Sequence, residues 1–352
     1  MCYAWNVTDM STPISPSTPP RSSERRLERE RLLHIHELML EGRVLEERLI
    51  RMQRQGEGYF WIGGPGEEAF NTSLGLLMKK GHGLDYDYLH GHYRSSATLA
   101  AMGAPSIDAL RQMHNTKTDP YSQGRNFVGH FSKREWNVVP ITSPIEVQFS
   151  VAIGTAFAQR RHGGTGITIV QGGDAGTAEG DFATCLVWSS RPGKELPILI
   201  IVTNNEWGIS TAADTQHGEQ FISDRGKPFG MRTAVCDGND VEASWFAIQD
   251  AMDYVRTERK PFVLQANLSR LYGHSSSSGS NYVESEPDCL PLLADKLDRR
   301  GWRSLDETAA LREQIETKMR EDYEQVLGEP KPAPQDAFDY VFADKNYVAG
   351  EV

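Results

Sequence analysis

Two segments decide the fold of this chain: residues 167–176, ITIVQGGDAG, and residues 197–205, PILIIVTNN. Each begins with β-branched or apolar residues and ends in small or polar ones, which is typical of a strand buried on both faces of a sheet. Residues 181–190 between them are expected to form a helix. A strand, a helix and a second strand in this order predict a parallel sheet with a right-handed crossover.

A third unit of the same kind follows along the chain. Residues 232–236 and 262–266 are expected to be strands, and the residues between them a helix. Asp240 is placed to cap that helix by accepting a hydrogen bond from its first turn. Its apolar face is formed at steps of four and three residues by Val241, Trp245, Ile248, Met252 and Val255.

The segments around the sheet are expected to be mainly helical. Residues 24–55 combine many charges with recurrent leucines, which indicates one or two amphipathic helices. Residues 67–113 are expected to be helical with loops. Ser304 and Glu307 have the spacing of a capping box, which predicts the start of a last helix. Its apolar stripe would be formed by Leu311, Ile315, Met319 and Tyr323.

The fold class predicted from these elements is α/β, with a parallel sheet flanked by helices and with helical N-terminal and C-terminal extensions. Residues 1–23 are rich in Ser, Thr and Pro and are expected to be a disordered tail. Residues 24–330 would form the α/β domain, and residues 331–352 an arm over its surface. The Ser-rich residues 274–287 are expected to be mobile.

The composition of the 352 residues is that of a globular enzyme and excludes several classes of partner. A net charge of −11 argues against nucleic acid and anionic membranes as partners, because phosphate binding needs a basic face. No apolar run is long enough to span a membrane. Four widely spaced cysteines favour a reducing compartment, so we expect the cytoplasm, or the mitochondrial matrix in a eukaryote. His34, His36 and His82 are interpreted as surface residues.

The polar residues at two strand ends indicate a ligand site. Ligands of parallel sheets bind beyond the carboxyl ends of the strands, where Asp174 and Asn205 are expected to lie close together. A carboxylate and an amide oxygen suit Mg²⁺. Gly173 and Gly176 allow the backbone to approach a phosphate. The alternative interpretation is two ordinary turns, and a dinucleotide fingerprint is not matched.

These two motifs resemble the signature of thiamine-diphosphate enzymes, which is Gly-Asp-Gly followed after 25 to 30 residues by Asn-Asn. Further motifs make the chain similar to the α subunits of 2-oxo acid dehydrogenases, the E1 component, over about residues 30–330. In chain order these motifs are Gly66-Glu-Glu-Ala69, Tyr93-Arg94, Gly124-Arg125 with His130, Ser143-Pro144 with Gln148, Ala178-Glu-Gly-Asp181, Asn204-Asn-Glu-Trp-Gly-Ile-Ser210, Asp237-Gly-Asn-Asp240, and Arg270 with Gly273-His-Ser275.

The resemblance implies a role for each site residue. Asp174, Asn205 and the carbonyl of Trp207 would hold Mg²⁺. His274 would face the reacting carbon of the cofactor and help to transfer the acyl group. The backbone at Ser143 and Ile145 would hold the aminopyrimidine. The diphosphate would be bound by Tyr93, Arg94 and Arg270, with His92, Gly173, Ala175 and Gly176 around it.

Three departures from the family pattern bear on the cofactor. Ala175 stands where the signature has its second glycine, and its methyl group is expected to fit only if φ is negative. Thr203 stands where branched-chain enzymes often have an arginine. Val147 replaces a hydroxyl residue that helps to bind a structural K⁺ in some relatives. Thr142, Gln148 and the Pro144 carbonyl would then be its remaining ligands.

The resemblance also implies partners. In this family the glutamate that activates the cofactor comes from a separate β subunit, so an α₂β₂ heterotetramer is expected. The acyl group passes to the lipoyl domain of the E2 acyltransferase. Branched-chain 2-oxo acids are the favoured substrates, with pyruvate or acetoin as alternatives. Tyr59, Phe60 and Trp61 are candidates either for the acyl pocket or for the core.

A hypothesis of another class is a non-catalytic regulatory or scaffolding paralogue, which Ala175 and Thr203 suggest. The presence of Asp174, Asn205 and His274 argues against it.

Overall fold

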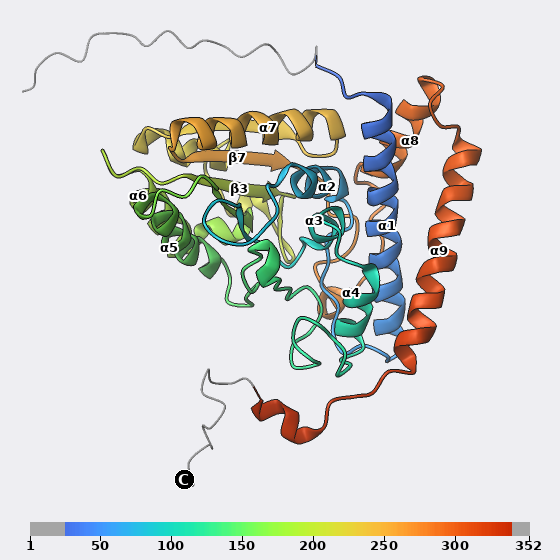
Figure 1. Cartoon of the computed structure of the whole chain (residues 1–352). Helices are drawn as coiled ribbons and strands as arrows, with labels where there is room; N and C mark the ends of the chain where they lie inside the picture. The colour runs from blue at the N-terminus through green and yellow to red at the C-terminus, as the bar shows by residue number, and fades with distance from the viewer. Residues whose placement is uncertain (1–24, 340–352) are drawn as a thin grey trace, which may run out of the picture.

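The central sheet is parallel throughout. In the computed structural model, which describes residues 25–339, it has the strand order β1-β2-β3-β7-β6 (Figure 1). The strands are β1 (Tyr88–His90), β2 (Thr168–Gly173), β3 (Ile198–Asn204), β7 (Phe262–Asn267) and β6 (Arg232–Asp237), and each pairs in parallel with its neighbours. A short antiparallel pair, β4 (Trp207–Gly208) and β5 (Thr211–Ala212), follows β3. The predicted α/β fold is confirmed.

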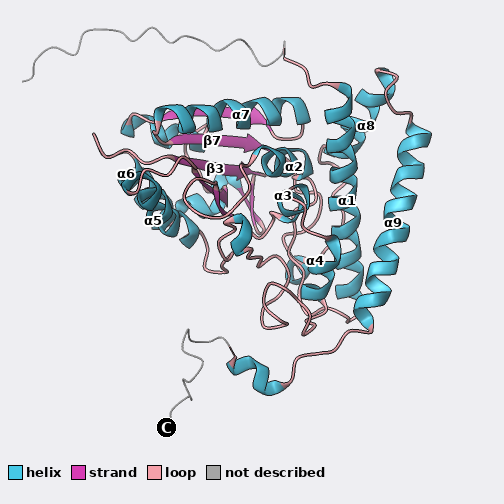
Figure 2. Ribbon diagram, viewed as in Figure 1, coloured by secondary structure: helices cyan, strands magenta, loops and turns pink. Residues whose placement is uncertain are grey.

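Helices cover both faces of the sheet (Figure 2). On one face lie α5 (Val147–Arg161) and α6 (Gly180–Ser189), and on the other α7 (Val241–Glu258) with α2 (Glu68–Leu77) against it. The alternation along β3 explains this arrangement, because Ile200 packs into the α5–α6 cluster whereas Ile201 packs into the cluster of α7. As predicted, Asp240 caps α7 by accepting a hydrogen bond from the Ala243 N–H.

The helical extensions form a layer beside the sheet. The predicted helix at residues 24–55 is one helix, α1 (Arg29–Arg54), and α9 (Leu305–Leu327) lies alongside it (Figure 1). Ser304 and Glu307 form the predicted capping box of α9. The layer also contains α3 (Ser96–Ala101), α4 (Ser106–Met113) and α8 (Cys289–Arg299), of which α8 was not predicted from the sequence. Short 3-10 helices lie at Arg134–Trp136, Ala175–Ala178, Ala213–Thr215, Ile222–Phe229, Ser276–Ser278 and Pro334–Phe338.

The described C-terminal part of the chain, residues 331–339, lies against the domain. The predicted tail, residues 1–23, lies outside the described residues. The described part of the predicted arm follows a segment anchored by a hydrogen bond from the Lys117 N–H to the Pro330 carbonyl. The Lys331 ammonium then donates to the His114 carbonyl. Residues 331–339 thus run against the loop that follows α4.

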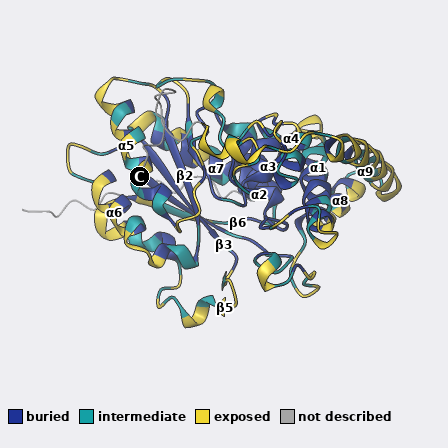
Figure 3. Ribbon diagram, turned by 90° about the horizontal axis from the view of Figure 1, so that it is seen from below, coloured by how far each residue is buried: buried dark blue, intermediate teal, exposed yellow. Residues whose placement is uncertain are grey.

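Burial is concentrated in the sheet and in the inner faces of the helices, and much of α9 faces solvent (Figure 3). Within residues 25–339, none of the helices combines the length and the apolar character needed to cross a bilayer.

One interpretation of the histidines is wrong. His34 and His82 are exposed, as expected, but His36 is fully buried on the inner side of α1. Its Nδ1 accepts a hydrogen bond of 3.0 Å from the Arg303 guanidinium at the start of α9. Burial, aided by the charge of Arg303, lowers the pKa of His36 to about 4. The packing of α9 against α1, which the pattern of α1 alone does not reveal, covers this position.

His36 should make the fold sensitive to acid. The folded chain keeps it neutral, whereas the unfolded chain protonates it near pH 6.5, so stability is full above pH 6.5 and is lost as the pH falls toward 4. Between pH 7 and pH 5 this costs about 2 kcal/mol of unfolding free energy. His36→Gln keeps an acceptor for Arg303 but cannot be protonated. Between pH 7 and pH 5, we expect its unfolding free energy, measured by denaturant titration, to fall by about 2 kcal/mol less than that of the unaltered chain.

The matched control for this prediction is His34→Gln, on the exposed side of the same helix. It should leave the pH dependence of stability as in the unaltered chain. Identical pH dependence in the His36 and His34 variants would show that His36 is not a source of acid sensitivity.

Candidate active site

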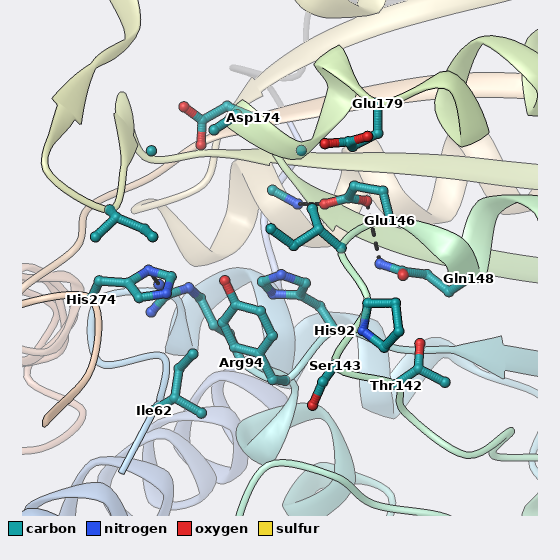
Figure 4. A pocket seen from close by; sticks show the side chains of 18 of the residues that line it. Ile62, His92, Arg94, Thr142, Ser143, Glu146, Gln148, Asp174, Glu179 and His274 are labelled. Atoms are coloured by element: carbon teal, nitrogen blue, oxygen red, sulfur yellow. Dashed lines mark hydrogen bonds between the residues drawn. The ribbon is translucent and has the colours of Figure 1, made fainter. Parts of the chain in front are cut away.

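A cavity of about 420 Å³ opens beyond the carboxyl ends of β2 and β3. This is where ligands of parallel sheets bind. All of the predicted site residues except Arg270 line it: His92, Tyr93, Arg94, Ser143, Ile145, Gly173, Asp174, Ala175, Gly176, Asn205, Trp207 and His274. Residues that lie far apart in the sequence are therefore brought to one place in the fold (Figure 4).

The acidic end of the cavity fits a divalent metal ion. Asp174 directly follows β2 and is 1% exposed, and its Oδ2 has no hydrogen-bond partner among the described residues. Burial raises the pKa of Asp174 above its usual value, which shows how poorly the carboxylate is compensated. The buried Asn205 lies at the end of the neighbouring strand, where its Oδ1 accepts from the Trp207 N–H at 3.1 Å. A cation here would satisfy the unpaired oxygen.

The opposite side of the cavity is held by Arg94 (Figure 4). Its guanidinium is buried, donates to the Gly63 carbonyl, and contacts His274 Nδ1 at 3.0 Å. Since arginine only donates, Nδ1 accepts, and the proton of the neutral ring is on Nε2. Behind Arg94, burial raises the pKa of Glu67 to about 8, although Arg94 lies only 3.7 Å from its carboxylate and opposes the shift.

His274 is a neutral histidine in this setting. Burial, together with the charges of Arg94 and Arg270, lowers its pKa to about 4. The Tyr93 ring is edge-on to the His274 ring, with 5.9 Å between the ring centroids. It is tilted by 39° against the His92 ring, with 3.7 Å between the centroids. The His274 ring is thus held by the hydrogen bond from Arg94 and by its contact with the Tyr93 ring.

Two further polar groups lack partners and lie near the cavity. Nδ1 of the buried His92 has no hydrogen-bond partner among residues 25–339. The same holds for Nη1 of Arg270, whose guanidinium lies 5.7 Å from the Trp207 ring. Ser143 differs, because its hydroxyl is bonded to His130 Nε2 at 2.7 Å. A guanidinium nitrogen without a partner, beside a carboxylate oxygen without one, suits an anion that binds together with a metal ion.

The comparisons with known proteins agree with this geometry. The model of the family described as dehydrogenase E1 component matches residues 36–335. The chain belongs to the dehydrogenase E1 component family. It is 28% identical to the mitochondrial 2-oxoisovalerate dehydrogenase subunit alpha of Bos taurus, over 94% of this chain and 72% of that protein. It is also 28% identical to the 2-oxoisovalerate dehydrogenase subunit alpha of Bacillus subtilis, over 88% of this chain and 94% of that protein.

Membership in the E1 family implies dependence on thiamine diphosphate, and two departures from the family motif now have a structural explanation. Ala175 lies in a 3-10 helix and is not among the residues with positive φ, so its conformation is open to alanine. Its methyl group has room because residue 208 is glycine: a Cβ there would lie 2.7 Å from that of Ala175. Thr203 is buried and donates to the Gly172 carbonyl at 3.2 Å, so it adds no charge to the site.

The three aromatic candidates for the acyl pocket, Tyr59, Phe60 and Trp61, lie in three different environments. Phe60 lines the cavity together with Ile62 and Phe127. Trp61 is fully buried and donates from its indole to Glu46, which makes it a core residue. Tyr59 is 81% exposed. An apolar lining for an E1 substrate therefore comes from Phe60 and not from its two neighbours.

The Ser-rich segment after His274 is folded onto the E1 domain. Ser276 donates from its backbone to the Trp61 carbonyl at 2.8 Å, and Ser275 and Ser278 form a capping box. Ser275 is only 4% exposed. These contacts give the turn a defined conformation, and any enzyme that modifies Ser275 would first have to open it.

Glu146 is a residue of the site that was not predicted from the sequence. This residue is 3% exposed and lines the cavity, where its Oε1 accepts from the Gly173 N–H at 3.2 Å. Burial, together with the nearby Asp174 and Glu179, raises the pKa of Glu146 to about 8. The sequence does place an acidic residue close to Ser143 and Pro144, which could have indicated a site residue. Whether its side chain enters the cavity, however, depends on the fold.

Proposed function

We propose that this chain is the α subunit of a branched-chain 2-oxo acid dehydrogenase. With a separate β subunit in an α₂β₂ heterotetramer, it would carry out the Mg²⁺-dependent and thiamine-diphosphate-dependent oxidative decarboxylation of a 2-oxo acid. It would then transfer the acyl group to the lipoyl domain of the E2 acyltransferase. The main support is the cavity in which the unpaired Asp174 carboxylate faces the Arg94–His274 pair.

Each residue has a physical role in this proposal. Asp174 Oδ2, Asn205 and the Trp207 carbonyl would hold Mg²⁺, and Arg94 and Arg270 would offset the charge of the diphosphate. When bound, the cofactor supplies the electron sink for decarboxylation. K⁺ is not part of the proposal, since the side chain of Val147 supplies no oxygen where some relatives have a hydroxyl ligand.

His274 would be the proton donor during acyl transfer. The two arginines that lower its pKa are the groups that the diphosphate would neutralise. Binding of an anion at Arg94 and Arg270 would offset these two charges and raise the pKa of His274 in part, because burial, the larger cause of the low pKa, remains.

The branched-chain substrate is supported by the apolar lining and by the relatives. Phe60, Ile62, Phe127 and Ile145 line the cavity, and the relatives named above act on 2-oxoisovalerate according to their names. An isopropyl group exceeds the methyl group of pyruvate by two carbons, which is worth about 1.6 kcal/mol when buried. The location in the cytoplasm or the mitochondrial matrix stays a prediction.

Reconstitution with a β subunit tests this function. With 2-oxoisovalerate and an artificial electron acceptor, we expect kcat/KM to exceed that for pyruvate by about tenfold or more, as the buried area requires. The α chain alone should show no turnover, because the activating glutamate belongs to the β subunit. Robust turnover without a β subunit, or a preference for pyruvate, would contradict the proposal.

A further inference from the structure

Glu146 is held in a conformation that only a few residue types adopt readily. It precedes α5 with φ of 61°, in the left-handed region that favours glycine. The backbone there directs the side chain into the cavity, and its two oxygens bond the Gly173 N–H and the Gln148 amide (Figure 4). Strain of this kind is usually found at functional sites.

The carboxyl group of Glu146 fills a recess between two glycines. A Cβ added to Gly172 would overlap with Oε2, and one added to Gly176 would overlap with Oε1. These glycines flank the turn after β2, whose backbone is free to approach a phosphate. The Gly173 N–H points into this recess and is used by Glu146.

The electrostatic surroundings make a carboxyl group costly here. The charged groups that act most strongly on Glu146 are Asp174, Glu179 and Asp181, which are all acidic. A buried carboxylate without a cation is expensive, and nearby negative charges add to the cost. Packing alone would be better served by an apolar side chain.

We propose that Glu146 is an internal competitor that limits the affinity of this chain for its cofactor. Its carboxyl group accepts the hydrogen bond of the Gly173 N–H and fills the recess, both of which a bound diphosphate would need. Binding must displace this side chain or offset its charge. The inference rests on the proposed function and adds to it a residue that sets how tightly the diphosphate is bound.

Two substitutions test the occupancy of the recess. Glu146→Gln keeps the shape and resembles the protonated side chain, because the pKa of Glu146 is raised to about 8 and little charge remains to be removed near neutral pH. Glu146→Gly empties the recess and suits the positive φ. The control is Glu258→Gln, which is the same substitution but lies exposed at the end of α7. Thermal unfolding of each complex checks that the variants fold.

The test is calorimetric titration of the α–β complex with Mg-thiamine diphosphate and with Mg-pyrophosphate. We expect Glu146→Gly, which empties the recess, to bind both ligands at least about tenfold more tightly than the unaltered complex, equivalent to about 1.4 kcal/mol. Glu146→Gln, which still fills the recess, should gain less, and Glu258→Gln should gain nothing.

The results that would overturn the inference differ from those that would overturn the function. If the unaltered complex binds the cofactor and the Glu146 variants bind it equally or more weakly, Glu146 is not a competitor, and weaker binding would make it a ligand. If neither the unaltered complex nor any Glu146 variant binds the cofactor, both the proposed function and the inference are wrong.

Discussion

Asp174→Ala is expected to abolish the binding of Mg-thiamine diphosphate to the α–β complex. Asp174 supplies the charged protein ligand of the proposed metal ion, and its buried Oδ2 has no hydrogen-bond partner within residues 25–339. Loss of an outer-shell partner typically lowers metal affinity about 10- to 100-fold. Loss of a direct ligand should therefore lower it at least about 100-fold, measured as the dissociation constant by calorimetry.

The same variant should fold normally. In the absence of metal, Asp174 is a poorly compensated acid whose pKa is raised by burial. Its removal relieves a cost of burial, so the melting temperature of the ligand-free complex should stay the same or rise. Near-normal affinity in a folded Asp174→Ala complex would show that the metal is bound elsewhere.

His274→Ala is expected to separate two activities of the enzyme. Transfer of the acyl group to the lipoyl domain needs a proton donor near the dithiolane, and loss of a positioned acid or base typically costs about 10²-fold or more. Decarboxylation measured with an artificial electron acceptor does not need that proton and should fall much less. The two rates, measured on one preparation, give the ratio that tests the role.

A second variant distinguishes proton delivery from positioning. His274→Gln can still accept the hydrogen bond from Arg94 Nη2, so it keeps the guanidinium in place, but it cannot transfer a proton. We expect it to lose acyl transfer as severely as the alanine variant and to keep most decarboxylation. An equal loss of both activities in both variants would make His274 a ligand of the cofactor or substrate.

The metal end of the site could be predicted from the sequence because it depends on local patterns. Asp174 and Asn205 each end a buried apolar run, and adjacent parallel strands place such residues together. The register pairs Gly173, which directly precedes Asp174, with Thr203, which lies two residues before Asn205. The resemblance to E1 α subunits added the more distant residues.

The other side of the site depends on contacts that no local pattern contains. Arg94 and His274 are 180 residues apart in the sequence and meet only through the complete fold. Glu146 belongs to a motif with Ser143 and Pro144, yet its entry into the recess depends on a left-handed backbone angle. His36 was misplaced because α9, a distant helix, covers it.

The order of the strands in the sheet and the helix α8 also could not be predicted from the sequence. β7 lies between β3 and β6, so the last strand in the sequence is not at the edge of the sheet, and chain order does not reveal such an insertion. β1, with three residues, is too short to show a periodic pattern. α8 has a proline at its third position and follows a Ser-rich segment, which hid its apolar face.

Calorimetric titration of the unaltered α–β complex with thiamine diphosphate, with and without Mg²⁺, tests the central claim most directly. The claim is that the cavity between Asp174 and the Arg94–His274 pair binds this cofactor through a metal ion. We expect one cofactor to bind per α chain when Mg²⁺ is present, and binding to be lost when the metal is chelated. A complex that folds and assembles but binds no cofactor, or binds it equally well without metal, would contradict this claim.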